Sequence, residues 1–259
     1  MGHSTSFPEM TASGEAIDTY IQKRNAGLNL DLQQPRDLFN QFITDAFPAG
    51  ATLNPKAAGE VFDWRQSDEN NLDVIAKVIS KVADTVTQGL IGEELLPAPI
   101  MIGIATTCIT DVMGLFTTRT EGTFSSSVRE VPLSPGLRMF AVSVSIEMTD
   151  TQIFNQGKMV VSWILYKIIF NNELYKEEEK TKILDSIAKL LDQDLKTIND
   201  ANTKINELEE SLLNMDPGPE YDKIQTRVDN DTKILAKQTA LVMDLSQEID
   251  NTKTMLLRK

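Results

Sequence analysis

Residues 184–215 read LDSIAKLLDQDLKTINDANTKINELEESLLNM, and every seventh residue from Leu184 onward is apolar. A second set of positions with the same spacing begins three residues later, at Ile187. The first set is Leu184, Leu191, Ile198, Ile205 and Leu212, and the second is Ile187, Asp194, Ala201, Leu208 and Met215. Two such positions in each heptad form the seam along which helices pack. The stretch therefore predicts a long amphipathic helix with a partner along its seam.

The same repeat resumes after the sequence DPGP at residues 216–219, which ends a helix. Its positions are Val228, Leu235, Val242, Ile249 and Leu256, with Ile224, Asp231, Gln238, Leu245 and Thr252 between them. Two seams on either side of a Pro-Gly turn predict an antiparallel helical hairpin, with arms of roughly 40 residues and about 60 Å. Ile234, Leu241 and Met255 add a second apolar edge, which favours a bundle of four or five helices.

Three more helices are predicted in the first 96 residues. One spans residues 15–25, one follows Pro35, and one runs from Ser67 to about residue 89. The second has the apolar face Leu38, Phe39, Phe42, Ile43 and Phe47, and the third has Leu72, Ile75, Ile79, Val82 and Val86. Residues 48–50 and the pair Asn54-Pro55 are typical of loops.

The middle of the chain has a different character. Residues 95–110, LLPAPIMIGIATTCIT, carry no charge, although Pro97 and Pro99 argue against a continuous helix at the start of this run. Residues 140–146 alternate between apolar and small side chains, which is typical of a strand. Residues 159–170 are apolar apart from Ser162 and Lys167. Both apolar runs are shorter than the roughly 20 residues of a simple transmembrane helix.

Charge and composition exclude several classes of function. The chain of 259 residues has a formal net charge of −13, and an acidic chain is repelled by the phosphates of nucleic acids. It contains one histidine, His3, and one cysteine, Cys108. An intramolecular disulfide is therefore impossible. The chain has too few Cys and His residues for a typical zinc site. A catalytic Ser-His or Cys-His pair would have to use His3 as its base. We expect no nucleic-acid partner, no cofactor, no metal and no enzymatic activity.

Two residues of the middle segment allow alternative interpretations. Asp111 is the one charge next to a long apolar run, so it is either a pore-lining or switch residue or a helix cap or loop carboxylate. Cys108 is either an acylation site or a small buried hydrophobic residue.

These features predict a mainly α fold. Residues 1–96 and 171–259 form an elongated helical-bundle tail that contains the hairpin, and residues 97–170 form an apolar head inserted between tail helices. This order resembles the cytolysin A-type α-helical pore-forming toxins, which include the haemolysin BL components and the tripartite toxins, and among these the smaller component. The strand at residues 140–146 resembles part of the β-tongue found in some heads of that family.

The resemblance implies a toxin component that hides its head in water and inserts it into a target-cell membrane. Such a component assembles into an oligomeric pore, together with partner components, and is secreted without a recognisable signal peptide. Because its apolar head must be masked in water, we also expect a homo-oligomer in solution. The residues that the resemblance assigns to the membrane lie in the two apolar runs. They are Ile100, Met101, Ile102, Ile104, Ile109, Val112, Met113, Leu115, Phe116, Val160, Val161, Trp163, Ile164, Leu165, Ile168, Ile169 and Phe170.

Two other interpretations fit the same residues. The first is a coiled-coil scaffold whose hairpin docks partner proteins and whose end carries a globular α+β domain. The second is a compact α/β cytolysin with a central sheet, which predicts substantial strand content by circular dichroism where the helical bundle predicts strongly helical spectra.

Overall fold

The computed structural model describes residues 33–66, 79–80, 83–84, 95–114, 124–149 and 158–258. Their elements, in chain order, are α3 (Gln33–Asp45), β1 (Asn54–Gln66), α5 (Ala98–Gly114), β2 (Phe124–Ser134), β3 (Leu137–Thr149), β4 (Lys158–Phe170), α6 (Asn172–Glu177), α7 (Lys180–Leu213) and α8 (Pro219–Leu257). The helices predicted at residues 15–25 and 67–89 lie outside the described residues, except that residues 79–80 and 83–84 are helical.

The four strands form one antiparallel sheet in the order β1-β4-β3-β2. Strands β2, β3 and β4 follow one another as a meander, and the turn between β2 and β3 contains Gly136, whose φ is +67°. Strand β1 pairs with β4, from Asn54 opposite Phe170 to Gln66 opposite Met159. The first strand in the sequence is therefore held by the last one.

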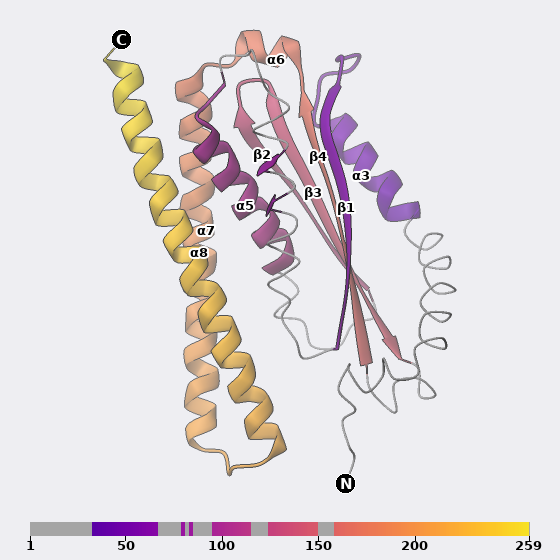
Figure 1. Ribbon diagram of the computed structural model, residues 1–259, viewed down its shortest axis with the longest axis vertical. Helices are drawn as coiled ribbons and strands as arrows, with labels where there is room; N and C mark the ends of the chain where they lie inside the picture. Colours follow the sequence, from indigo (N-terminus) through magenta and orange to yellow (C-terminus); the bar gives the residue numbers. More distant parts are fainter. Residues whose placement is uncertain are drawn as a thin grey trace.

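Helices cover both faces of this sheet (Figure 1). Helix α3 packs on one face. Helix α5 packs on the other face against β2 and β3, and the α7–α8 hairpin lies outside α5, with α8 contacting α5 and α7 contacting β2. The sheet therefore sits between a single short helix and a double layer of helices.

This architecture corrects the predicted fold class. The described residues contain 13-, 11-, 13- and 13-residue strands beside the helices, so the fold is not a mainly α elongated bundle. The physical reason lies in β3 and β4, whose apolar residues fill two cores on opposite faces of one sheet. A strand buried on both faces is continuously apolar, and its sequence alone does not distinguish it from a buried helix.

The helical hairpin is present where the heptads predict it. Helices α7 and α8 contain 34 and 39 residues, which corresponds to about 51 and 59 Å at 1.5 Å per residue. The first set of seam positions is buried along both arms except for Leu256, and most of the second set is half-buried. The hairpin packs against α5 and β2 rather than against further long helices among the described residues.

Strand β1 connects two regions that the sequence analysis places apart. Its residues belong to the predicted tail, whereas its partner β4 belongs to the predicted head. Asn54 and Pro55, expected in a loop, begin this strand, and a bulge follows between Pro55 and Ala57. Residues 49–50 form the predicted turn.

Candidate functional site

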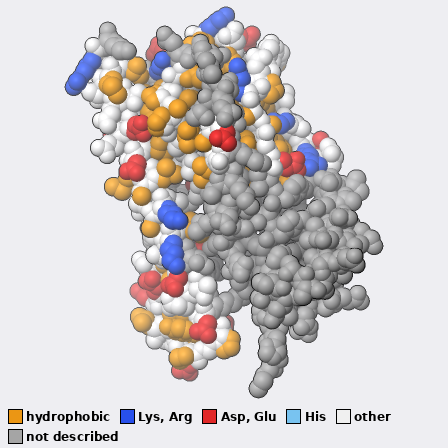
Figure 2. Space-filling view, in the orientation of Figure 1, with side chains coloured by type: hydrophobic (Ala, Val, Ile, Leu, Met, Phe, Trp, Pro, Cys, Tyr) orange, Lys and Arg blue, Asp and Glu red, His pale blue; other side chains and the backbone are white. Residues whose placement is uncertain are grey.

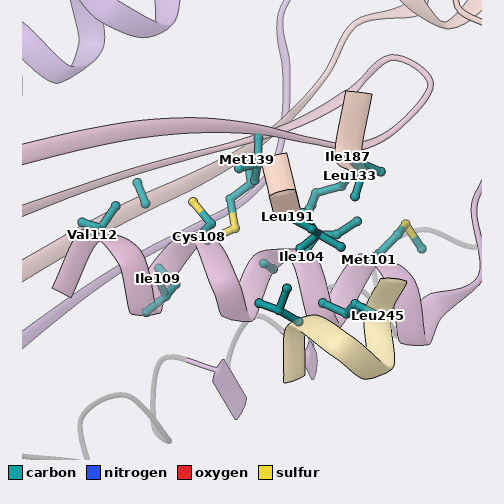
Figure 3. Packing of buried hydrophobic residues seen from close by; sticks show 14 of the residues in the cluster. Met101, Ile104, Cys108, Ile109, Val112, Leu133, Met139, Ile187, Leu191 and Leu245 are labelled. Carbon is teal, nitrogen blue, oxygen red and sulfur yellow. The ribbon is translucent and has the colours of Figure 1, made fainter. Parts of the chain in front are cut away.

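The most apolar part of the molecule is the layer between the sheet and the hairpin. We call it the covered layer, and it consists of α5 together with the sheet side chains that face α5. In Figure 3, Met101, Ile104, Cys108, Ile109 and Val112 of α5 point toward side chains from both sides. Those from the sheet are Leu133 and Met139, and those from the hairpin are Ile187, Leu191 and Leu245. The covered layer is thus enclosed by protein on two sides.

The α5 residues expected to enter a membrane lie in this layer. Ile100, Met101, Ile104, Ile109 and Val112 are all buried, with 3% or less of each exposed. Ile102 is half-buried against the same core. Met113 belongs to α5, but its side chain, and the whole of Leu115 and Phe116, lie outside the described residues.

The β4 residues expected to enter a membrane are divided between the two faces of the sheet. Ile164, Ile168 and Phe170 belong to the core on the α5 side. Trp163 and Ile169 belong to the core under α3, and Leu165 packs against it. Val160 and Val161 lie in β4, with side chains outside the described residues. The predicted residues therefore do not form one surface, because side chains alternate along a strand.

Polar contacts fix α3 over its face of the sheet. The indole Nε1 of Trp163 donates to Glu60 Oε1 at 2.5 Å, and Arg36 Nη2 lies 2.7 Å from the same oxygen. The Arg36 guanidinium also lies over the Trp163 ring, 5.3 Å from its centroid. Lys167 Nζ donates to Asn40 Oδ1 at 2.7 Å. Glu60 of β1 and Lys167 of β4 thus hold α3 on the sheet through Arg36 and Asn40.

The threonines of α5 satisfy their hydroxyl groups within the helix itself. Thr106 donates to the carbonyl of Ile102, Thr107 to that of Ile104, and Thr110 to that of Thr106, each at 2.8 Å. Such bonds to the preceding turn leave no hydroxyl donor in need of an external partner. Apart from Asp111, the described side chains of α5 therefore need no polar group outside their own helix.

Helix α8 approaches α5 most closely at Gly103. A Cβ atom at this position would lie 2.2 Å from Cδ2 of Leu245 and 2.9 Å from its Cγ. Leu245 is itself buried, so its side chain fills the space that the glycine leaves. The contact shows that the hairpin lies directly on α5, with no intervening side chain at that point.

One cluster of charges is partly buried at the edge of the covered layer. Arg129 of β2 lies 2.5 Å from Oδ2 of Asp111 on α5 and 2.6 Å from Oδ1 of Asp194 on α7. The Asp194 side chain is 5% exposed, and those of Asp111 and Arg129 are about a quarter exposed. We call these three residues the charge cluster. It joins the helix, the sheet and the hairpin at one point.

Burial changes the acidity of two groups on α5. It raises the pKa of Asp111 to about 7, and the neighbouring Asp194 carboxylate adds to this rise while Arg129 opposes it. Burial also raises the pKa of the Cys108 thiol to about 12. A fully buried, protonated thiol is a poor nucleophile, which agrees with the interpretation of Cys108 as a small buried hydrophobic residue.

The sequence analysis singled out one member of this cluster, Asp111, as the charge beside an apolar run. Asp194 entered it only as one position of the heptad seam. Arg129 was missed. The signal that could have found it is the seam itself, because a carboxylate at a buried heptad position needs a cation nearby.

The outer surface carries apolar side chains in two places. Figure 2 shows hydrophobic side chains over the upper part of the molecule, where α8 lies beside α5, and at the tip of the hairpin. Exposed large apolar residues of the hairpin are Leu213 at the tip and Met243, Met255 and Leu257 on α8.

Metal and membrane-spanning features were sought in the part of the chain that the structure describes. It contains no group of three or more His, Cys, Asp or Glu side chains placed to hold a metal ion. Its helices are all too short or too polar to cross a bilayer. Comparison of the chain with protein-family models, with curated proteins and with solved structures finds no match.

Proposed function

We propose that the protein is a non-enzymatic, membrane-acting cytolysin of compact α/β architecture, in which α5 is the element that enters lipid. The observation that carries the proposal is the chemistry of α5. Its described side chains are apolar or satisfied within the helix, with Asp111 as the exception, and it is covered by a separate amphipathic hairpin. This function does not require an elongated helical bundle, which the structure contradicts.

Lipid can replace the protein around α5 at little cost. Helical backbone groups are satisfied within the segment, which is the condition for entering hydrocarbon. The apolar side chains exchange one apolar environment for another, and Asp111 can enter as the neutral acid because its pKa is already raised. The main resistance is therefore the separation of α5 from the sheet and the hairpin, whose inner faces are left uncovered.

The length of α5 indicates how it acts. Its 17 residues extend about 26 Å, less than the roughly 30 Å of a hydrocarbon core. A single α5 is therefore proposed to bury itself in one part of the bilayer, and a pore is proposed to need several copies, with or without partner components. In this proposal the protein acts after export, on the membrane of a target cell, and Met243, Met255 and Leu257 of α8 make the first contact with lipid.

A disulfide between α5 and α8 tests the proposal. Gly103→Cys and Leu245→Cys, in a Cys108→Ala background, place a thiol on each helix at their closest approach and remove the leucine atoms that a Cβ at residue 103 would meet. We expect the oxidised variant to release no calcein from phosphatidylcholine vesicles, with or without phosphatidylserine and cholesterol. The same protein reduced with dithiothreitol should release it as the Cys108→Ala parent does.

Equal dye release by the oxidised and reduced forms contradicts the role of α5. Failure of the wild-type protein to bind or permeabilise any of these vesicles contradicts the membrane function itself. Circular dichroism of both redox states controls for folding.

A second candidate function is a scaffold that docks partner proteins on its hairpin. The observation that favours it is the distal part of α7 and α8, which continues past the end of α5 and carries the exposed Leu213 at its tip (Figure 1). This function predicts a protein that is indifferent to lipid and whose partner binding is lost on Leu213→Ser, whereas the disulfide between α5 and α8 leaves it unchanged.

A further inference from the structure

The charge cluster contains one cation and two carboxylates. Arg129 is within 2.6 Å of both Asp111 and Asp194, so it cannot neutralise the two of them together. With both carboxylates ionised, the cluster has a net charge of −1 at a site where Asp194 is almost fully buried. One added proton makes the cluster neutral.

The surroundings of Asp111 favour that proton on its carboxyl group. Burial raises the pKa of Asp111 to about 7, and the nearby Asp194 carboxylate adds to the rise, because a second negative charge beside the same guanidinium disfavours ionisation. Oδ2 of Asp111 is buried and accepts no hydrogen bond from the described residues, despite its proximity to Arg129. The guanidinium beside that oxygen is shared with Asp194, so the charge of an ionised Asp111 is only partly compensated.

The three residues also come from three different elements. Asp111 lies on α5, Arg129 on β2 and Asp194 on α7, and α7 contacts β2 beside them. Among the described residues, Arg129 and Asp194 are the charged groups that change the pKa of Asp111, and Cys108, one turn earlier on α5, is a neutral thiol. An uncompensated charge here acts directly on the attachment of the hairpin to the layers beneath it.

We propose that Asp111, Arg129 and Asp194 form a proton-holding clasp, and that loss of its single proton weakens the attachment of the α7–α8 hairpin to α5 and β2. The clasp is a property of the protein in water and does not depend on the membrane function proposed above.

The direction of the effect follows from linkage. The pKa of Asp111 is about 7 in the folded protein and near 3.8, the ordinary value of an aspartate, in the unfolded chain. The folded state therefore binds more protons between these values, so the clasp stabilises it at low pH and this stabilisation is lost as the pH rises toward 7. Above that pH the difference levels off. The cluster therefore stabilises the folded protein most at low pH and least at pH 7 and above.

Two substitutions and a control test the clasp. Asp111→Asn mimics the protonated residue, and Asp194→Asn removes the second carboxylate from the Asp111–Arg129 pair. Asp185→Asn, an exposed carboxylate of α7 paired with Lys253 at 2.9 Å, is the matched control, because its pKa is lowered and it titrates below the pH range of interest. Each protein is unfolded in urea from pH 5 to pH 8.5, and hydrogen exchange in α5 and α7 is measured at the same pH values.

We expect the unfolding equilibrium constant of the wild-type protein, relative to that of Asp111→Asn, to rise about tenfold for each pH unit between pH 5 and 7 and then to level off. Amide protection around Asp194, corrected for intrinsic exchange rates, should fall in the same range. Asp194→Asn should show a smaller pH dependence than the wild-type protein, because burial alone then raises the pKa of Asp111. Asp185→Asn should match the wild-type protein.

An identical pH dependence in the wild-type protein and Asp111→Asn overturns the proposal. It is equally overturned if neither asparagine variant folds at any pH while Asp185→Asn does, because both carboxylates are then required as charges. Loss of the pH dependence in Asp111→Asn and its reduction in Asp194→Asn, with no change in hydrogen exchange of α7, overturns the link to the hairpin.

Discussion

Replacement of Gly136 by alanine is expected to lower the free energy of unfolding by about 3 kcal/mol or more. Gly136 has a φ of +67°, in the left-handed region that costs a residue with a Cβ about 1–2 kcal/mol. A Cβ there would also lie 2.6 Å from the carbonyl oxygen of Asn171 and 2.9 Å from Cα of Tyr175. These are backbone atoms, which cannot move aside as the end of a flexible side chain can.

The surroundings of Gly136 explain why this turn is so closely held. Its N–H donates to Glu178 Oε2 at 2.7 Å, and its carbonyl accepts from the Asn171 N–H at 2.8 Å. Glu178 also pairs with Arg138, which follows the turn on β3. The turn thus anchors the start of α7 to the sheet, and displacing it disturbs both.

Gly50 provides the matched control. It too has a positive φ, +82°, but a Cβ there would meet no atom within 4 Å. Gly50→Ala should therefore cost only about 1–2 kcal/mol, the conformational part alone. Urea denaturation of the two variants measures the difference, and equal losses of stability would show that the close approach at Gly136 is unimportant.

The second large effect is expected for Phe140→Ala, which should cost about 3–5 kcal/mol. Phe140 is fully buried in β3 under α3. Its ring lies 5.9 Å from that of Phe42 in an edge-on arrangement and 5.8 Å from that of Phe47. Removing it opens a cavity beneath α3 and deletes both aromatic contacts.

The comparison for this prediction is Phe170→Ala, a buried phenylalanine of β4 on the opposite face of the sheet. Both variants should be less stable in urea. Only Phe140→Ala should increase hydrogen exchange in α3, because Phe170 packs in the α5-side core instead. If Phe170→Ala loosened α3 to the same extent, the two cores would not be independent.

The hairpin and α3 could be predicted from the sequence because one face of each is polar. Leu184, Leu191 and Ile198 recur with the heptad period, and all three are buried in the structure. Phe39 and Ile43 of α3, four residues apart, are also buried and lie on the same face of that helix. In a helix with one solvent-exposed face, apolar and polar residues alternate with the helical period, so the sequence identifies the helix.

The sheet could be predicted from the sequence only where apolar and small or polar side chains alternate along a strand. Residues 140–146 lie within β3 as expected, since Ser143 breaks the apolar run. Strand β4 is apolar on both faces, from Trp163 under α3 to Ile164 under α5, so it shows no period. Helix α5 begins at Ala98 despite Pro97 and Pro99, because prolines in a first turn take the place of N–H groups that have no helical partner.

The candidate site was predicted in part. The apolar run that forms α5 and the charge of Asp111 were identified, but Asp194 was only a seam position and the common partner Arg129 was not identified. Arg129 lies 18 residues after Asp111 and 65 before Asp194, and only the packing of β2 beside α5 and α7 brings the three together. No local sequence pattern indicates a contact between residues that lie so far apart in the chain.

The order of elements along the chain also determines when the apolar helix is covered during synthesis. Helix α5 ends at Gly114, but α8, which lies on it at Gly103, ends at Leu257. A ribosome adding about 5–20 residues per second needs about 7–30 s to make the residues between them. During this interval the nascent chain exposes α5 without its outer layer, so chaperones have access to it before the hairpin does. Strand β1 likewise has no pairing partner until β4 has been synthesised. The four-stranded sheet is therefore completed only after most of the chain has been made.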